Sequence, residues 1–340
     1  MFAKVKPEIL AVLAMYRIKG EHLRAVKDTV GVVNETYFIF DGNKKWVLRK
    51  SSAQTTLEHL RFEQKLLAYL PKHGFKLAPR AIRNKYDQTI TRLNKSLFTV
   101  QEFLPGKIVG SWNDVSRFTK PRVDAFFKMI AEFSKATKYF IREPNTGSHT
   151  LWWHVQRSPR QFQKIVRTMP ASAGKNLLVK NRKNILSFFS ATKEQFIQTK
   201  YDALRKQVVH FDWHLGNVHF NGNTIVGVFD FDWAQFDCRL TDVANAICMS
   251  CYYYGGPKDG QFRKDIIKCA PQSYRESYGK SEYDAIRENE LIKVAVRGCA
   301  LFQFLWAGDF YKSKPSAQRL VILKHFLKML LDNDYDGLFS

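Results

Sequence analysis

Two stretches of the chain alternate apolar and polar residues, which is the pattern of a half-buried β-strand. The first comprises residues 30–40 (VGVVNETYFIF) and 44–50 (KKWVLRK), separated by Asp41-Gly42-Asn43. Asp-Gly is a strong signal for a hairpin turn. We therefore predict a strand, a turn and a strand here, preceded by helices over about residues 1–27.

The second alternating stretch follows a short apolar pair, Val208-Val209. Residues 218–220 and 224–229 are joined by Asn221-Gly222-Asn223, which again favours a tight turn. This stretch predicts a second β-hairpin.

Apolar residues at helical spacing fill most of the remaining chain. Residues 56–70 predict a helix, and residues 96–103 predict another strand, which ends in Leu104-Pro105-Gly106. Beyond that turn we predict helices over residues 122–139, 159–169, 181–200, 290–310 and 316–331.

These elements predict an α+β fold with two lobes. A small antiparallel-sheet lobe spans residues 1–105, a hinge lies at residues 101–106, and a mainly helical lobe spans residues 107–340. A chain of this length can bury a core in each lobe.

Residues with the chemistry of phosphoryl transfer surround the second hairpin. His210, Asp212 and Asn217 stand in the order H-x-D-x-x-x-x-N, and the hairpin ends in Asp230-Phe231-Asp232. In phosphoryl transfer one carboxylate orients the acceptor hydroxyl, while an amide oxygen and a second carboxylate hold Mg²⁺ against the nucleotide phosphates. We predict Asp212 as the catalytic base, His210 as a brace for its loop, and Asn217 and Asp230 as metal ligands.

A metal-dependent hydrolase is the alternative interpretation of the same segment. His214 extends the motif to H-x-D-x-H, and His219 lies close by, so ligand types are plentiful. This interpretation leaves Asn217 and Asp230 without a role. We favour phosphoryl transfer and interpret the two histidines as a loop residue and a strand residue.

A positively charged residue lies at the end of the first hairpin. Arg49 ends its second strand, where it can reach nucleotide phosphates, although an isolated arginine at such a place is more often simply solvated. Glu63 falls on or beside the apolar face of the 56–70 helix and is well placed to pair with that cation. Gly31 and Asn34 precede or begin the first strand, where the backbone can approach a phosphate.

These residues resemble a known family. The segments VVNETYFIF, WVLR, QEFLPG, HFDWHLGN and VFDFDW, followed by LTDVA, resemble the aminoglycoside phosphotransferase and choline kinase superfamily, which has a protein-kinase-like fold. The chain is most similar to the branch of type II homoserine kinases and kinase-like proteins of bacterial spore coats. The resemblance covers most of the chain.

The resemblance implies specific roles. Asp212 matches the catalytic base, and Asn217 and Asp230 match the Mg²⁺ positions, with Asp232 as a nearby auxiliary carboxylate. Asp242 matches an aspartate that supports the catalytic loop. The remaining matches concern the nucleotide: Glu63 pairs with the phosphate-binding cation, and Gln101, Glu102 and Phe103 form the adenine hinge.

Two positions depart from the family pattern. Arg49 stands where many relatives have lysine; because its guanidinium is planar and permanently charged, the substitution affects the expected rate more than phosphate binding. Thr137 stands where many relatives have histidine, which predicts a different acceptor pocket. Trp112, Trp152 and Trp153 are candidates to line that pocket, or core residues.

The charge is the unusual feature of the composition. The formal net charge is +23, and residues 157–206 hold twelve Lys or Arg but only two acids. Such a surface attracts polyanions, acidic membranes or an anionic substrate; a solvated face without a partner is the alternative. No signature of specific RNA or DNA binding accompanies the charge.

The cysteines and the apolar segments indicate the cellular compartment of the protein. Cys248 and Cys251 form a C-x-x-C pair within an apolar run, but no second pair completes a zinc site, so we predict buried free thiols in a reducing compartment. The most apolar stretch, residues 294–308, contains Arg297, and no segment approaches membrane-spanning length without a charge. We expect a cytoplasmic protein, a monomer or homodimer.

The sequence thus predicts an ATP- and Mg²⁺-dependent kinase that phosphorylates a hydroxyl of a small molecule, such as an amino acid, an amino sugar or a choline-like compound. The basic C-terminal lobe favours an anionic acceptor over a cationic one. The alternative is a kinase-like spore-coat or scaffold protein that binds a polyanionic partner. A protein kinase is less favoured, because no D-F-G or A-P-E segment is present.

Overall fold

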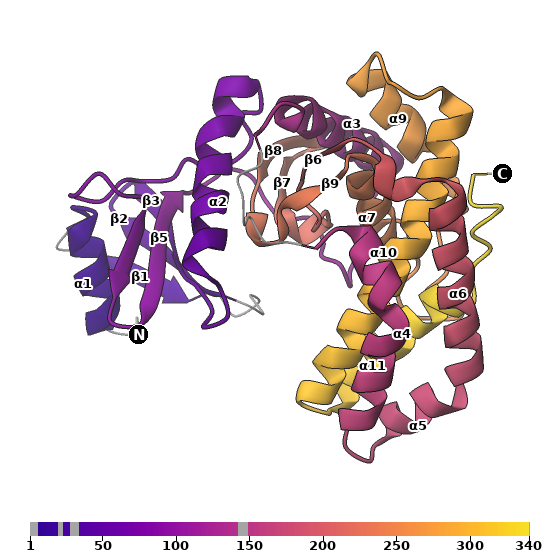
Figure 1. Cartoon of the computed structure of the whole chain (residues 1–340). Coiled ribbons are helices and arrows are strands. Elements are labelled where there is room, and N and C mark those ends of the chain that lie inside the picture. Colours follow the sequence, from indigo (N-terminus) through magenta and orange to yellow (C-terminus); the bar gives the residue numbers. More distant parts are fainter. Residues whose placement is uncertain (1–5, 20–22, 28–33, 142–148, 340) are drawn as a thin grey trace. The chain divides into compact units, whose positions relative to one another are not determined.

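The computed structural model describes residues 6–19, 23–27, 34–141 and 149–339 (Figure 1). The chain divides into two compact units. The first holds the described residues up to Gly106 together with Val226–Asp232. The second holds Lys107–Ile141, residues 149–225 and residues 233–339. The predicted beginning of the first strand at residues 30–33, with Gly31, lies outside the described residues.

One antiparallel sheet organises the first unit, with the strand order β1-β2-β3-β5-β4. Its strands are β1 (Arg24–Lys27), β2 (Glu35–Asp41), β3 (Lys44–Lys50), β4 (Ile90–Leu93) and β5 (Ser96–Glu102). Strands β2 and β3 form the predicted first hairpin, and Gly42 in its turn has a φ of +56°, which glycine adopts without steric cost. The prediction of helix through residue 27 is wrong at its end, since residues 24–27 pair with β2 as an edge strand.

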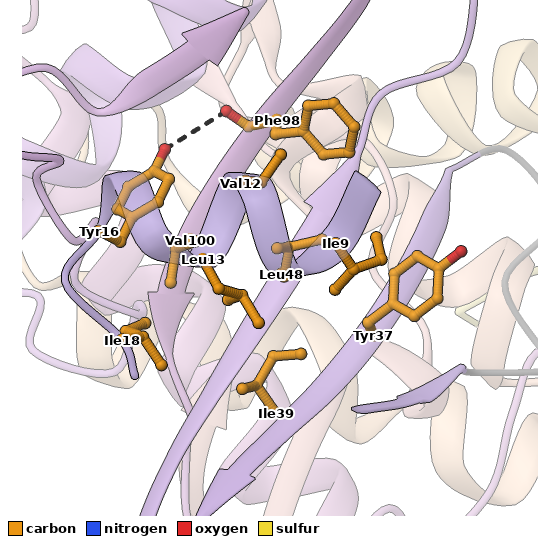
Figure 2. Close-up of a cluster of buried hydrophobic side chains, with 10 residues drawn as sticks. All are labelled: Ile9, Val12, Leu13, Tyr16, Ile18, Tyr37, Ile39, Leu48, Phe98 and Val100. Carbon is orange, nitrogen blue, oxygen red and sulfur yellow. Dashed lines mark hydrogen bonds between the residues drawn. The ribbon is translucent and has the colours of Figure 1, made fainter. Parts of the chain in front are cut away.

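A hydrophobic core joins this sheet to α1 (Pro7–Met15). Figure 2 shows Ile9, Val12 and Leu13 of the helix against Ile39, Leu48 and Val100 of the strands. The second helix of the unit, α2 (Leu57–Tyr69), begins at Thr56, whose hydroxyl accepts a hydrogen bond from the backbone N–H of His59. It continues into the short turn η1 (Leu70–His73).

Helices dominate the second unit, and the long helix α10 packs against α4, α7 and α11 (Figure 1). The helices are α3 (Lys120–Thr137), α4 (Leu151–Thr168), α5 (Ala173–Lys180), α6 (Arg182–Gln198), α7 (Leu240–Ser250), α8 (Lys264–Ile267), α9 (Cys269–Tyr278), α10 (Ala285–Ser313) and α11 (Ala317–Leu331).

Helix α4 begins eight residues earlier than the sequence predicts. We expected Pro159 to start the helix, because proline lacks an N–H and suits the first turn. In the structure Pro159 lies inside α4. Proline has no N–H, so Pro159 cannot donate the helical hydrogen bond to the Val155 carbonyl. The hydroxyl of Ser158 donates to that carbonyl instead (2.8 Å). The local side chain thus satisfies the group that proline leaves open.

Two small sheets carry the segments with candidate chemistry. Strand β6 (Lys206–Val209) pairs antiparallel with β9 (Gln235–Cys238), a strand the sequence analysis missed. Strands β7 (Val218–Asn221) and β8 (Thr224–Val228) form the predicted second hairpin. Short 3-10 turns link these strands to their neighbours: η2 (Tyr201–Ala203), η3 (Leu215–Asn217) and η4 (Phe231–Trp233).

Helix α10 contains the apolar stretch at residues 294–308 with its charged residue Arg297. Its 29 residues are long and apolar enough to cross a membrane by length and composition, and it is the one such helix among the residues the structure describes. However, 89% of its most apolar window is buried inside the protein, as in the core helix of a folded domain. Nearby, Cys248 and Cys251 are buried free thiols, as predicted.

Candidate active site

Residues of α7 hold the loop that follows β6 through hydrogen bonds to its backbone. The carboxylate of Asp242 accepts the backbone N–H groups of His210 (3.0 Å) and Phe211 (2.9 Å). The side-chain oxygen of Asn245 accepts the N–H of Trp213 (2.8 Å). Helix α7 starts at Leu240 without a side-chain cap, so the Asp242 carboxylate does not cap the helix and bonds to the loop.

Packing of aromatic rings also holds this loop in place. The buried ring of His210 stacks on Trp213, with 4.3 Å between ring centres, and lies edge-on to Phe133. Phe211 has a φ of +62°, a left-handed conformation that is unusual for a bulky residue. Such conformations persist where the surroundings hold them and cluster at functional sites. Its ring is buried.

Asp212 and Asn217 meet at the mouth of this loop. The amide nitrogen of Asn217 donates both to the backbone oxygen and to the Oδ2 atom of Asp212, each at 2.9 Å. Burial alone would raise the pKa of Asp212, but the nearby His214, His210 and the Asn217 amide outweigh it and lower that pKa below the ordinary value. Asp212 is therefore ionised at neutral pH.

His214 is a residue whose place in the site the sequence analysis missed. Its Nδ1 atom accepts the N–H of Gly216 (3.0 Å), and its Nε2 atom lies 3.7 Å from Oδ2 of Asp212. The sequence shows that His214 lies two residues after Asp212, but it does not show that the turn η3 places the His214 ring against the loop. Within the described ranges, no three His, Cys, Asp or Glu side chains are grouped to hold a metal ion, so the ligand set that the hydrolase alternative requires is not assembled there.

A second cluster of charged residues lies within the first unit and is centred on Arg49. This buried guanidinium contacts Oε1 of Glu63 (2.9 Å), Oδ1 of Asp230 (2.9 Å) and Oδ1 of Asp232 (2.7 Å). Burial by itself would lower the pKa of Arg49, yet the three carboxylates together raise it, so the cation is permanent. Burial raises the pKa of Glu63 above its ordinary value, and the positive charge of Arg49 opposes that effect.

Two amino-terminal residues complete this cluster. The amide nitrogen of Asn34 donates to Oδ2 of Asp232, and its oxygen accepts the N–H of Ser52 (2.9 Å). His59 of α2, which the sequence analysis did not consider, has its Nε2 atom 2.7 Å from the backbone oxygen of Asp232. The structure therefore brings the predicted residues Asn34, Arg49, Glu63, Asp230 and Asp232 together in one unit.

The predicted adenine hinge consists of residues with different surroundings. Gln101 is buried, and its amide lies 3.4 Å from Oε1 of Glu63. The carboxylate of Glu102 pairs with Arg80 (2.9 Å). The ring of Phe103 lies edge-on to Phe38, with 6.0 Å between centres. Phe103 thus belongs to an aromatic patch, whereas the other two side chains are engaged in polar contacts.

The predicted acceptor-pocket residues separate into three environments. Thr137 is fully buried and its hydroxyl donates to the backbone of Val208 (2.9 Å), so it supports the fold rather than lining a pocket. Trp152 stacks on Phe196. Trp112 and Trp153 are partly exposed and belong to separate aromatic groups.

The donor atoms of both clusters suit a hard divalent cation. In Asn217 both hydrogen bonds use the amide nitrogen, so the amide is oriented and its oxygen is presented as a potential ligand. Asp230 and Asp232 offer carboxylate oxygens that are now compensated by Arg49. Oxygen ligands of this kind bind Mg²⁺ or Ca²⁺ in preference to softer metals.

Comparisons with known proteins agree with this chemistry. The model of a phosphotransferase enzyme family matches residues 25–275. A homoserine kinase from Zymomonas mobilis subsp. mobilis is 24% identical over 312 residues, which are 91% of this chain and 88% of that protein. A homoserine kinase from Janthinobacterium sp. is 28% identical over 222 residues, 63% of this chain and 60% of that protein.

Solved structures show the same fold at lower sequence identity. The amicoumacin kinase hAmiN, in complex with AMP-PNP, Ca²⁺ and Ami, has a TM-score of 0.70 at 16% identity and covers 97% of this chain and 96% of its own. The microcompartment-associated aminopropanol kinase has a TM-score of 0.70 at 14% identity, and the match covers 97% of this chain and 98% of that kinase. These likenesses confirm the predicted protein-kinase-like fold, with an antiparallel-sheet lobe and a mainly helical lobe.

Proposed function

Because this chain belongs to the phosphotransferase enzyme family and is a small-molecule kinase, we propose that it transfers the γ-phosphate of ATP to a hydroxyl group of its acceptor. The Asp212–Asn217 pair supports this proposal most directly. It joins an ionised carboxylate to the amide nitrogen of Asn217, which leaves the amide oxygen as a potential metal ligand, on a loop that Asp242 and Asn245 hold by hydrogen bonds.

We assign the roles as follows. Asp212 orients the acceptor hydroxyl and accepts its proton late in a loose transition state, so its position matters more than its basicity. His210 positions this loop through its stacked ring and its backbone N–H. Asn217 and Asp230 would hold Mg²⁺, with Asp232 as an auxiliary carboxylate. When bound, the ion would neutralise charge on the nucleotide phosphates.

The Arg49 cluster then serves the nucleotide. Arg49, positioned by Glu63, would contact the phosphates, and Asn34 would help to order the same region. The aromatic patch at Phe103 offers a surface for an adenine ring beside the backbone of Gln101 and Glu102. Under this proposal the first unit is the nucleotide-binding lobe, and the second is the catalytic and acceptor-binding lobe.

The acceptor is proposed only as a class. The names of the relatives make L-homoserine the first compound to test, followed by amino sugars and choline-like alcohols. Those names refer to kinases and not to coat proteins, so we do not pursue the spore-coat alternative further. A cytoplasmic location and a monomeric or dimeric state stay predictions.

Nucleotide-dependent stabilisation tests the proposal. ATP with Mg²⁺ should raise the unfolding free energy by about 2.7 kcal/mol at a hundredfold excess over Kd. Asp230→Asn should lose the Mg²⁺-dependent part of that shift, whereas Asp212→Asn should keep it and lower turnover by orders of magnitude. A full Mg²⁺-dependent shift in Asp230→Asn, or equal turnover in Asp212→Asn, would refute the assigned roles.

A further inference from the structure

A continuous group of rings leads away from the catalytic loop within the second unit. Phe211 precedes Asp212, and its ring lies 5.1 Å from that of Phe302 on α10. Phe302 also contacts Trp233 (5.9 Å) and His154 of α4 (4.7 Å). We call these four residues, with Trp153 and Arg157, the aromatic wall.

The wall ends in a cation on α4. The ring of Trp153 lies 5.0 Å from that of His154 and is stacked face to face with His149 at 3.5 Å. The guanidinium carbon of Arg157 lies 4.4 Å from the centre of the Trp153 ring, a cation–π contact. Arg157 therefore has a defined position although its side chain is exposed.

The polar groups of the wall are not used internally. No side-chain hydrogen bond or ion pair joins Arg157 or His154 to any other residue that the structure describes, and residues 149–168 contain no Asp or Glu. Burial, and to a smaller extent His149, lowers the pKa of His154 to about 4, so its ring is neutral at pH 7 and can donate an N–H. One cation and one neutral donor thus lie together without a carboxylate partner.

The apolar part of the wall is also open to solvent. Trp233 is 38% exposed and Phe302 is half-buried. An exposed tryptophan is common on surfaces, but this one touches the same ring that the catalytic loop touches. Aromatic surface with a few placed polar groups is the usual lining of a small-molecule site.

We propose that the aromatic wall is the acceptor subsite, and that it selects a hydroxyl compound with an apolar or planar body and an anionic group. The body would lie against Phe302 and Trp233, the anion would bind Arg157 and the ring N–H of His154, and the hydroxyl would reach Asp212. Arg binds carboxylate and phosphate in a bidentate geometry. This inference rests on the proposed phosphotransfer and specifies its substrate class.

A set of three probes that differ only in charge tests the inference. They are 4-(hydroxymethyl)benzoate, its neutral carboxamide and 4-(hydroxymethyl)benzylamine, and their binding to the full chain can be followed by tryptophan fluorescence without ATP. Each is then tested as an acceptor with Mg²⁺ and ATP. We expect the benzoate to have the highest kcat/KM and the amine the lowest.

Arg157→Gln should lower binding and kcat/KM for the benzoate by about tenfold or more, and should change those of the carboxamide less than twofold. Arg157→Lys should recover part of the loss, because it keeps the charge but not the bidentate geometry. Lys193→Gln, an equal loss of charge at an exposed position of α6, is the matched control and should behave like the wild type. The KM for ATP should not change in any variant.

The outcomes separate this inference from the proposed function. Equal losses for the benzoate and the carboxamide in Arg157→Gln, a preference for the amine, or no benzoate binding at millimolar concentration would overturn the subsite. Phosphate transfer to other acceptors in those cases would leave the kinase proposal intact. Conversely, benzoate binding that depends on Arg157, with no phosphate transfer to any acceptor, would leave the wall as an anion-binding surface and would refute both its role as the acceptor subsite and the proposed reaction.

Discussion

At the scale of single residues, the site depends on a few charges that are held by several partners at once. Arg49 is the clearest case, because one guanidinium compensates Glu63, Asp230 and Asp232 in a largely buried place. Its two terminal nitrogens are spread wide enough to reach all three carboxylates. A single ammonium group offers its donors from one point and cannot reproduce that arrangement.

Arg49→Lys should therefore destabilise the protein even though it keeps the charge. We expect the unfolding free energy to fall by about 1–3 kcal/mol, because at least one carboxylate loses its partner in a low-dielectric environment. Urea unfolding measures this change. Lys50→Arg is the matched control, since Lys50 is the next residue and pairs with Glu8 in a more exposed place, so its effect should stay within about 0.5 kcal/mol. Equal stability of wild type and Arg49→Lys would contradict this account.

Asp242 gives a prediction about pH. Burial raises its pKa from the ordinary value of 3.8 to about 7, although the N–H groups of Phe211 and His210 oppose the shift. The folded protein therefore binds more protons than the unfolded chain between about pH 4 and 7, and the contribution of Asp242 to stability falls as the pH rises through that window.

Asp242→Asn removes this titration and adds a roughly constant offset from its altered hydrogen bonds. We expect the stability difference between wild type and variant to shift against the wild type as the pH increases from about 4 to 7. Urea unfolding at several pH values measures the difference. A difference that does not vary with pH in this range would show that the two N–H donors cancel the effect of burial.

At the scale of elements, α4 links the fold to the candidate acceptor site. It carries Trp153, His154 and Arg157, and it continues through Pro159, where the Ser158 hydroxyl donates to the Val155 carbonyl. Had the helix begun at Pro159, these three residues would lie on a loop. The hydrogen bond of Ser158 thus supports the helical segment that carries these residues of the aromatic wall.

Ser158→Ala should cost about 1–3 kcal/mol of unfolding free energy, since it leaves the buried Val155 carbonyl without a donor. Thr168→Ala is the matched control: its hydroxyl makes the same kind of contact to Lys164 (2.8 Å) on the exposed end of the same helix, so the loss should be small. Thermal unfolding of both variants measures the effect.

A double-mutant cycle identifies the cause. Pro159→Ala restores a backbone N–H at that position, so Ser158→Ala should cost less in this background than in the wild type. An undiminished cost there would indicate that Ser158 acts through packing and not through the Val155 carbonyl.

At the scale of the whole molecule, the net charge of +23 means that the excess Lys and Arg side chains repel one another in the folded state. The Debye length falls from about 30 Å at 0.01 M to about 8 Å at physiological ionic strength. The thermal midpoint should therefore rise with added NaCl over this range, whereas an uncharged osmolyte at equal osmolarity should not reproduce the rise at such low concentration. A midpoint that falls with salt would mean that ion pairs outweigh the repulsion. A polyanionic partner of the basic stretch at residues 157–206 would be recognised by binding that weakens steeply as salt is added.

Local sequence patterns predicted most of the individual elements. Period-2 alternation and the Asp-Gly and Asn-Gly turns located both hairpins, since these signals act between neighbouring residues. The patterns failed where a distant partner decided the outcome. Residues 24–27 become a strand because β2 offers them an edge, and β9 forms because β6 does. The predicted start of α4 was wrong because Pro159 lies inside the helix, where the Ser158 hydroxyl donates to the carbonyl that proline leaves without an N–H partner.

Phosphoryl transfer could be predicted from the sequence alone, because His210, Asp212 and Asn217 and the acids that follow β8 supply the carboxylate and amide groups that the reaction uses. The side chains that surround these groups could not be predicted in this way, because they come from distant parts of the chain. Arg49 lies 181 positions from Asp230 along the chain, and Asp242 lies more than thirty from the N–H groups it accepts. Such contacts are chosen by how helices and strands pack, and packing depends on the shape of the whole folded chain and not on local periodicity.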